Sequence, residues 1–481
     1  MGRREQQIEH LLRRAGFGGS PNEIDFYSEI GVRGAIDLLI YFDQIPDDVD
    51  GRIGQAGNVS VTTRGTFAPH LNITDARQRW LFRMVHSERP LQEKMALFWH
   101  NHFATAYTKI AGAYDGTEAT RMLAAKPSED RDGTKGQLEL FRENALGNFR
   151  DLLLEVARDP AMLVWLDGRD NVVNPGVPQE NFAREVMELF TFGVANVVED
   201  DVKAAARVFT GWNLQRLGPS GANYYRYQFR ASRHDNQPKT FTFPIYPGGG
   251  TTIAPNGEQE GVDLITALCS HPATGPRLVR KLWAYFVSEI ADPPQAWVDG
   301  IAGIFYSTTF NMRAVVHAIL SSPEFWDPAA TFARYSWPVE YVIRSIKETG
   351  WTGYSVDSAL TPMLNMGQSL FEPPDVSGWD LGQSWFSTGA MLNRMNYAAS
   401  LTTNQRINLR NEARPFAQTP QGVMSFVMER LSPATLEPQS YDELLAYLRA
   451  GTNWTASDNE LRAKVAGVMH LVLGSSYYQL V

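Results

Sequence analysis

The sequence predicts a mainly α-helical protein, a large multi-helix, bundle-like fold with a small inserted β-hairpin or sheet. Apolar residues recur at helical spacing through most of the chain, and capping residues and glycines separate these segments. Strand-like alternation of apolar and polar residues is confined to residues 225–245. The 481 residues are enough for a large core and for more than one average domain.

Composition excludes several classes of protein. A charged fraction of 20% and a hydrophobic fraction of 43% are ordinary for a soluble globular protein. The net charge of −9 argues against a nucleic-acid-binding protein, which needs a basic face. The sequence contains no run of about 18 apolar residues, so it predicts no membrane span. The single cysteine, Cys269, excludes an internal disulfide, and its apolar helical neighbours predict an inert core position.

The N-terminal segment MGRREQQIEHLLRRAGFG is basic, but no apolar region and no small-residue cleavage site follow it. It is therefore not a signal peptide. As it stands, the sequence predicts a cytoplasmic protein, which would be exported only if a leader had been removed.

Helix signals follow one another from the start of the chain. Residues 8–12 form the apolar face of a first helix, which ends at Gly16. Ser20 and Glu23 then match a capping box, and two helices follow that are separated at Gly31. Further helices are predicted over residues 75–87, 91–103, 117–125, 148–157, 178–192, 199–210, 262–270, 273–289, 296–306, 312–321, 338–347 and 390–401, with three or four more near the C-terminus.

The strand-like stretch divides the helical part of the chain. Tyr225, Tyr227 and Phe229 alternate with polar residues, and residues 241–245 alternate likewise after a polar turn, which predicts a β-hairpin or small sheet. We therefore expect four parts. Residues 1–213 form an N-terminal helical lobe with the histidine and glutamate helices, and residues 214–258 form the β insert. Residues 259–404 form a second helical lobe with a Pro-Pro/Trp loop, and residues 405–481 form the C-terminal helices.

Two histidines flank one asparagine in the segment MALFWHNHFAT. A helix turns about 100° per residue, so His100 and His102 would point in nearly opposite directions and could not bind one metal ion together. His102 shares its stripe with Met95 and Phe98, the expected core face. Two interpretations stay open: satisfied core or cleft residues, or a metal ligand or acid–base group.

The segment PQENFAREVMELFTFG places several carboxylates on one helix. Glu180, Arg184 and Glu188 are spaced by four residues and form a charged stripe, and Glu185 adjoins it. These residues are either ordinary helix ion pairs or, among large apolar neighbours, functional carboxylates.

Other polar and aromatic positions are weaker candidates. His234 and Asp235 form a titratable pair on the predicted hairpin tip, with Lys239 as a nearby cation. Two further aromatic positions are Trp212 and the loop that contains Asp375 and Trp379. They are interpreted either as part of a ligand-binding surface or as core packing. The sequence contains no Gly-x-Ser-x-Gly, His-Glu-x-x-His or Walker A motif.

Taken together, the motifs resemble the bacterial family called domain of unknown function 1800, from about Leu11 to Leu401. The matching segments are LLRRAGFG, LQEKMALFWHNHF, ALGNFRDLL, ARDPAMLVWLD, ENFAREVMELFTFGV, VFTGWN, RHDNQPKTF, HPATGPRLVRKLW, SSPEFW, WPVEYV and LFEPPDVSGW. The resemblance implies no established activity and assigns no roles. It implies that many members are exported, and that a protein of the family called domain of unknown function 1501, which resembles sulfatases and alkaline phosphatases, is a candidate partner.

We expect the histidine helix, the glutamate helix and the hairpin tip to meet at one polar cleft. Such a cleft would suit a divalent metal ion or an acid–base pair. The expected function is a metal-assisted or acid–base hydrolase acting on a polysaccharide or another cell-envelope polymer. The alternatives are a non-catalytic helical scaffold for an envelope enzyme and an iron-dependent redox protein. The expected catalytic residues are Arg184, Glu185, Glu188, His234 and Asp235, the metal ligands His100, His102 and Glu180, and the substrate-binding residues Trp212, Lys239, Asp375 and Trp379.

Overall fold

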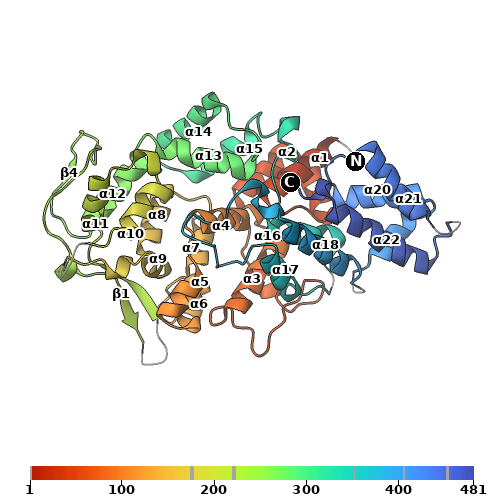
Figure 1. Ribbon diagram of the computed structural model, residues 1–481, viewed down its shortest axis with the longest axis horizontal. Helices are drawn as coiled ribbons and strands as arrows, with labels where there is room; N and C mark the ends of the chain where they lie inside the picture. The colour runs from red at the N-terminus through yellow and green to blue at the C-terminus, as the bar shows by residue number, and fades with distance from the viewer. Residues whose placement is uncertain (1–2, 174–177, 219–223, 352, 405–406, 451–453) are drawn as a thin grey trace.

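The computed structural model describes residues 3–173, 178–218, 224–351, 353–404, 407–450 and 454–481. The fold is mainly α-helical, as predicted, and the described residues form 22 α-helices and two small antiparallel sheets. The molecule is elongated, with the β insert at one end and the C-terminal helices at the other (Figure 1). None of the helices in the described ranges is long and apolar enough to cross a membrane.

The predicted helices occur in the predicted order, and further helices that the sequence analysis did not predict lie over residues 107–113, 137–143, 160–165 and 357–365. The first half of the chain contains α1 (Arg3–Ala15), α2 (Pro21–Ile40), α3 (Ile73–His86), α4 (Pro90–His102), α5 (Tyr107–Ala113), α6 (Gly116–Ala124), α7 (Gln137–Glu143), α8 (Phe149–Arg158), α9 (Pro160–Trp165), α10 (Asn181–Glu185) and α11 (Glu199–Val208). The second half contains α12 (Gln259–Ser270), α13 (Thr274–Phe286), α14 (Gln295–Ser307), α15 (Met312–Ser321), α16 (Pro338–Thr349), α17 (Asp357–Asn365), α18 (Thr388–Thr402), α19 (Leu409–Ala413), α20 (Pro420–Leu431), α21 (Pro438–Arg449) and α22 (Asp458–Gly474).

Local signals account for the helix ends. The Ser20 side chain accepts a hydrogen bond from the Glu23 backbone, and Glu23 bonds back to the Ser20 backbone, so the predicted capping box is confirmed. Gly31 has a φ of +76° and separates two helical segments within α2, where the sequence predicted the break.

The small β insert is present, but its strand pairing differs from the predicted one. Strand β2 (Tyr224–Phe229) pairs with β1 (Trp212–Leu217), whereas β3 (Lys239–Thr240) pairs with β4 (Thr252–Ile253). The expected pairing of residues 225–229 with residues 241–245 is therefore wrong. Alternation shows that a strand has two different faces, but it does not identify the strand that will pair with it. The expected boundary between residues 213 and 214 falls inside β1.

One continuous apolar core runs through the molecule and surrounds several buried ion pairs. Arg83 lies 2.7 Å from Glu139, and Arg334 lies 2.8 Å from Glu340, with all four side chains buried. Cys269 is fully buried in the same core, as predicted. These buried pairs fix how the central helices pack, because a buried charge without its partner is costly.

Candidate functional site

The two histidines of α4 contact different parts of the molecule. The Nε2 atom of His100 accepts a hydrogen bond from the Phe371 backbone N–H at 3.1 Å. The rings of Trp80 and Trp379 pack edge-on against the imidazole. Burial lowers the pKa of His100 to about 3. His100 is therefore a neutral anchor for the loop that begins at Phe371.

His102 instead joins α4 to the glutamate helix and to α13. Its Nδ1 atom accepts a hydrogen bond from Lys281 Nζ at 3.0 Å, and its Nε2 atom lies 3.2 Å from the Phe190 carbonyl oxygen. The proton consequently sits on Nε2, which donates to that carbonyl. Burial and the cations Lys281 and Arg277 hold the pKa of His102 well below its ordinary value. His102 is neutral at physiological pH.

The glutamate helix differs from the regular helix predicted from Pro178. It begins at Asn181 as α10 and continues as a π-helical turn, η5 (Val186–Phe190). Such turns are rare in proteins and are frequent at functional sites. Gly193, with a φ of +91°, follows the turn at the predicted stop. The helical spacing in the sequence did not reveal the π-helical turn, because its apolar residues fit an α-helix equally well.

The cation Arg277 and the neutral His102 both contact the carbonyl end of η5. Arg277 Nη1 donates to the Leu189 carbonyl oxygen at 2.7 Å, beside the bond from His102 to Phe190. Carbonyl groups at a helix end lack intrahelical donors and favour positive charge. The histidine helix and the glutamate helix therefore meet through the backbone of η5 rather than through the predicted carboxylates.

The charged stripe of the glutamate helix forms a partly exposed ion cluster. Arg184 lies 3.3 Å from Glu180 and 3.0 Å from Glu188, the predicted partners at a spacing of four residues. Glu199 of α11, which the sequence analysis missed, lies 2.8 Å from the same guanidinium. No such ion pair joins Glu185 within the described residues, and burial and the neighbouring Glu188 raise its pKa.

Sequence reasoning also missed Lys281 and Arg277. They lie four residues apart on α13 and are both partly exposed. Burial and the adjacent Arg277 lower the pKa of Lys281 to about 7. Neither side chain forms an ion pair with a carboxylate of the described residues. The sequence pattern that could have identified them is two cations at helical spacing among apolar residues in the segment RLVRKLW.

His234 and Asp235 do not lie on a hairpin tip, because the predicted hairpin does not form. His234 Nδ1 lies 2.8 Å from the Thr210 carbonyl oxygen, and its Nε2 lies 3.0 Å from Glu260. Both ring nitrogens therefore lie within hydrogen-bond distance of an oxygen atom. Lys239 Nζ lies 2.5 Å from the other oxygen of Glu260, and all three side chains are buried.

Asp235 belongs to the same region. Its carboxylate accepts a hydrogen bond from Arg207 at 2.7 Å. Burial opposes ionisation, but the bonds from Arg207 and from the Gln237 backbone hold the pKa of Asp235 below its ordinary value. The His-Asp pair is therefore part of a closed network of hydrogen bonds at the base of the insert.

The predicted substrate-binding residues lie in three further places. Trp212 is fully buried and Trp379 is nearly so. Trp379 and Trp385 line a small cavity of about 250 Å³, beside the loop that His100 holds. Asp375 accepts a hydrogen bond from the Ser377 backbone at 2.8 Å and so stabilises its own loop. Lys239 belongs to the Glu260 network described above.

The predicted metal ligands do not form a common group. His100, His102 and Glu180 bond to Phe371, Lys281 and Arg184, respectively. Among the residues that the structure describes, no three His, Cys, Asp or Glu side chains are placed to hold a metal ion.

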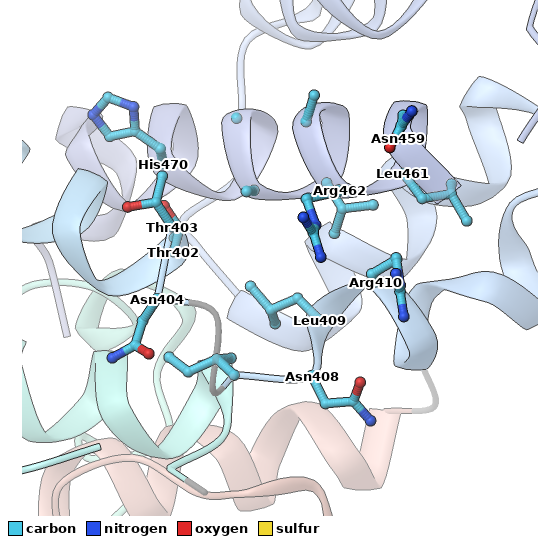
Figure 2. A pocket seen from close by; sticks show the side chains of 15 residues that line it. Thr402, Thr403, Asn404, Asn408, Leu409, Arg410, Asn459, Leu461, Arg462 and His470 are labelled. Atoms are coloured by element: carbon cyan, nitrogen blue, oxygen red, sulfur yellow. The ribbon is translucent and has the colours of Figure 1, made fainter. Parts of the chain in front are cut away.

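A pocket of about 470 Å³ lies elsewhere, between the end of α18, the start of α19 and the face of α22 (Figure 2). Arg410, Arg462 and His470 are among its lining residues. None of the residues predicted as a site from the sequence lines this pocket.

Comparison with known proteins identifies one family. The family model described as "Protein of unknown function (DUF1800)" matches residues 10–480, nearly the whole chain. No curated protein and no solved structure matches the sequence.

Proposed function

The chain belongs to the DUF1800 family, and we propose that it is a hydrolase-type enzyme that uses Lys281 for acid–base catalysis. The supporting observation is the environment of the Lys281 amine. Lys281 as a residue is partly exposed, and its desolvated amine bonds to the neutral His102 and has a pKa of about 7. A group whose pKa lies near the working pH can both accept and return a proton efficiently.

In the proposed reaction, the free amine of Lys281 removes a proton from water, and the water oxygen adds to the carbonyl carbon of an ester or amide. Arg277, whose guanidinium keeps N–H groups beyond its bond to Leu189, stabilises the negative charge on the carbonyl oxygen. The bond to the leaving group then breaks, and the leaving group takes the proton from the Lys281 ammonium. His102 is a positioning residue that holds Nζ.

We extend the proposal to an acyl group on a polysaccharide or other cell-envelope polymer. The basis is the family resemblance, which points to exported proteins and to a partner from the domain of unknown function 1501 family. The basic pair Arg277 and Lys281 favours a substrate that offers oxygen acceptors, because no carboxylate of the described residues neutralises it.

The test compares hydrolysis of nitrophenyl esters and O-acetylated polysaccharides by the wild type, Lys281→Met and a control, Lys203→Met. Lys203 is an exposed lysine of α11 that pairs with Asp200. We expect Lys281→Met to lose about 100-fold or more in kcat/KM, and the wild-type rate to change with pH near 7, while the control keeps its activity. Equal rates for both variants would contradict the proposal.

Competitive acetylation with acetic anhydride measures the basicity of Lys281 without any substrate. The extent of labelling at each pH, read by mass spectrometry, gives the pKa of this one amine. A midpoint near 7 is the expected result. A midpoint near 10, as in an ordinary exposed lysine, would remove the basis of the proposal.

A second candidate function, a non-catalytic scaffold for an envelope enzyme, is favoured by the network around Glu260. His234, Lys239 and Glu260 are buried and mutually satisfied, which is typical of residues that specify a structure. A scaffold would keep its partner binding in the Lys281→Met variant and would hydrolyse none of the substrates above.

A further inference from the structure

We propose that the pocket between α18, α19 and α22 binds a phosphorylated small molecule, whose phosphate group is held by Arg410 and Arg462 (Figure 2). The pocket has a volume of about 470 Å³, which is within the usual range for small-molecule sites and leaves room for an organic body beside the phosphate. The pocket does not include Lys281 or Arg277, so the proposal goes beyond the hydrolase function.

The two arginines reach the pocket from different helices, and both are accessible to a ligand. Arg462 is an exposed residue of α22 and extends from that helix toward α19 (Figure 2). It forms no ion pair with a carboxylate of the described residues. Arg410 lies on α19, and 33% of its side chain is exposed. A ligand in the pocket can therefore bond to both guanidinium groups without first displacing protein atoms.

Positive charge exceeds negative charge at the arginine end of the pocket. Asp458, at the start of α22, forms an ion pair with Arg414 and lies 3.6 Å from Arg410. The hydrogen bond from Arg414, together with the charges of Arg410 and Arg462, lowers the pKa of Asp458. Three guanidinium groups thus surround one carboxylate, and that carboxylate does not line the pocket.

The size of this excess favours a phosphate monoester. Three positive charges and one negative charge leave two positive charges. A phosphate monoester carries about −1.5 to −2 near pH 7 and balances them, whereas a carboxylate balances only one. The paired N–H groups of an arginine also match the spacing of phosphate oxygens. No Asp or Glu side chain is among the described residues that line the pocket. Glu460, the next carboxylate of α22, bonds to Thr455 instead.

The rest of the lining suits an organic body attached to the phosphate. Ala463 and Ala466 are at least partly exposed and offer apolar surface on α22. Thr403 and His470 supply hydrogen-bonding groups at the opposite end of the pocket (Figure 2). His470 lies eight residues beyond Arg462 on α22, about 12 Å along the helix axis. A ligand that contacts both ends must therefore be longer than a phosphate ion.

Isothermal titration calorimetry of the full chain with glucose 6-phosphate, AMP and glycerol 3-phosphate tests the proposal. We expect at least one of these esters to bind with a Kd of about 1 mM or below, and its unphosphorylated counterpart to bind at least about tenfold more weakly. Arg462→Gln should weaken ester binding about tenfold or more. The control Arg33→Gln, at an exposed arginine of α2 outside the pocket, should leave it unchanged.

A second variant blocks the pocket without changing its charge. Ala463 is exposed and lines the pocket, so Ala463→Trp should abolish ester binding while the protein keeps its melting temperature. Absence of binding by all three esters at about 10 mM would overturn the proposal. So would equal binding by the wild type and Arg462→Gln, glucuronate binding as tightly as glucose 6-phosphate, or inorganic phosphate binding as tightly as every ester. Lys281→Met should leave ester binding unchanged, and a loss of binding in that variant would also overturn the proposal.

Discussion

Lys281 Nζ donates a hydrogen bond to His102 Nδ1 over 3.0 Å, although the two residues lie 179 positions apart in the chain. The bond joins α13 to the histidine helix α4. The other ring nitrogen of His102 donates a hydrogen bond to the Phe190 carbonyl oxygen. A neutral imidazole offers no opposite charge to an ammonium group. The free energy of burying the Lys281 charge is therefore not offset, and its pKa falls to about 7.

Replacement of Lys281 by methionine should stabilise the protein in a pH-dependent way. The folded-state pKa of about 7 lies below the unfolded value, so below pH 7 the folded protein bears the full penalty of the buried charge. The penalty fades as the pH rises toward 10. Lys281→Met should raise the free energy of unfolding by about 1–2 kcal/mol at pH 6 and by less at pH 9. Urea denaturation at both pH values measures this, and a pH-independent difference would contradict it.

Asp159 should oppose folding at alkaline pH. Its buried carboxylate accepts hydrogen bonds from Met162 N and Gln137 Nε2 at 2.8 and 2.9 Å, but burial raises its pKa to about 7. The folded state thus loses stability as the pH rises from the unfolded pKa to 7. Asp159→Asn should therefore raise the free energy of unfolding by about 1–3 kcal/mol more at pH 8 than at pH 4.5.

The control for Asp159 is Asp115→Asn, at an exposed N-cap of α6 whose side chain accepts from Glu118 N at 2.8 Å. The control variant removes an exposed carboxylate, so it should not reproduce the extra gain in stability at pH 8 that is expected of Asp159→Asn. Parallel unfolding curves for the two variants would refute the role assigned to burial at Asp159.

Removal of Glu260 should be strongly destabilising. Burial alone would raise its pKa, but hydrogen bonds from His234 and Lys239 hold the pKa of Glu260 below its ordinary value. Glu260→Ala leaves the buried Lys239 ammonium unpaired, at an expected cost of about 3–5 kcal/mol. The double variant Glu260→Leu with Lys239→Met should recover part of that loss. Thermal unfolding of both variants checks this, and a double variant that is the less stable of the two would count against it.

Gly378 should be intolerant of any side chain. It has a φ of +88°, and a Cβ at this position would overlap the Asn101 side chain and lie 2.5 Å from the Asn101 carbonyl oxygen. Asn101 Oδ1 accepts a bond from Trp379 N at 2.7 Å, so the clash would push the loop off α4. Gly382 has a φ of +72° with open space around it. Gly378→Ala should therefore cost about 2 kcal/mol more than Gly382→Ala, which bears only the backbone penalty of about 1 kcal/mol.

Features of the fold and site that depend on neighbours in the chain were predictable. Helix α15 has the predicted bounds, the Ser20–Glu23 capping box forms, and Arg184 pairs with Glu180 and Glu188 at the predicted spacing. Helical hydrogen bonds and caps join residues three or four positions apart, so the sequence of each segment contains all the groups involved.

Features that depend on distant partners were not predictable. Alternation in residues 225–229 was correct for a strand, but its partner proved to be β1 rather than residues 241–245. His100 and His102 were correctly expected to diverge, yet their contacts, Phe371 and Lys281, come from remote segments. The same is true of Glu199 beside Arg184.

The sequence by itself determined the family through its motifs, and it determined the helical class of the fold and the order of most helices, because these rest on local periodicity and capping. Only the tertiary structure decided which polar residues share an environment and which proton each one holds. The basicity of an amine or carboxylate depends on the solvent and charges that surround it in space, and packing of remote segments supplies both.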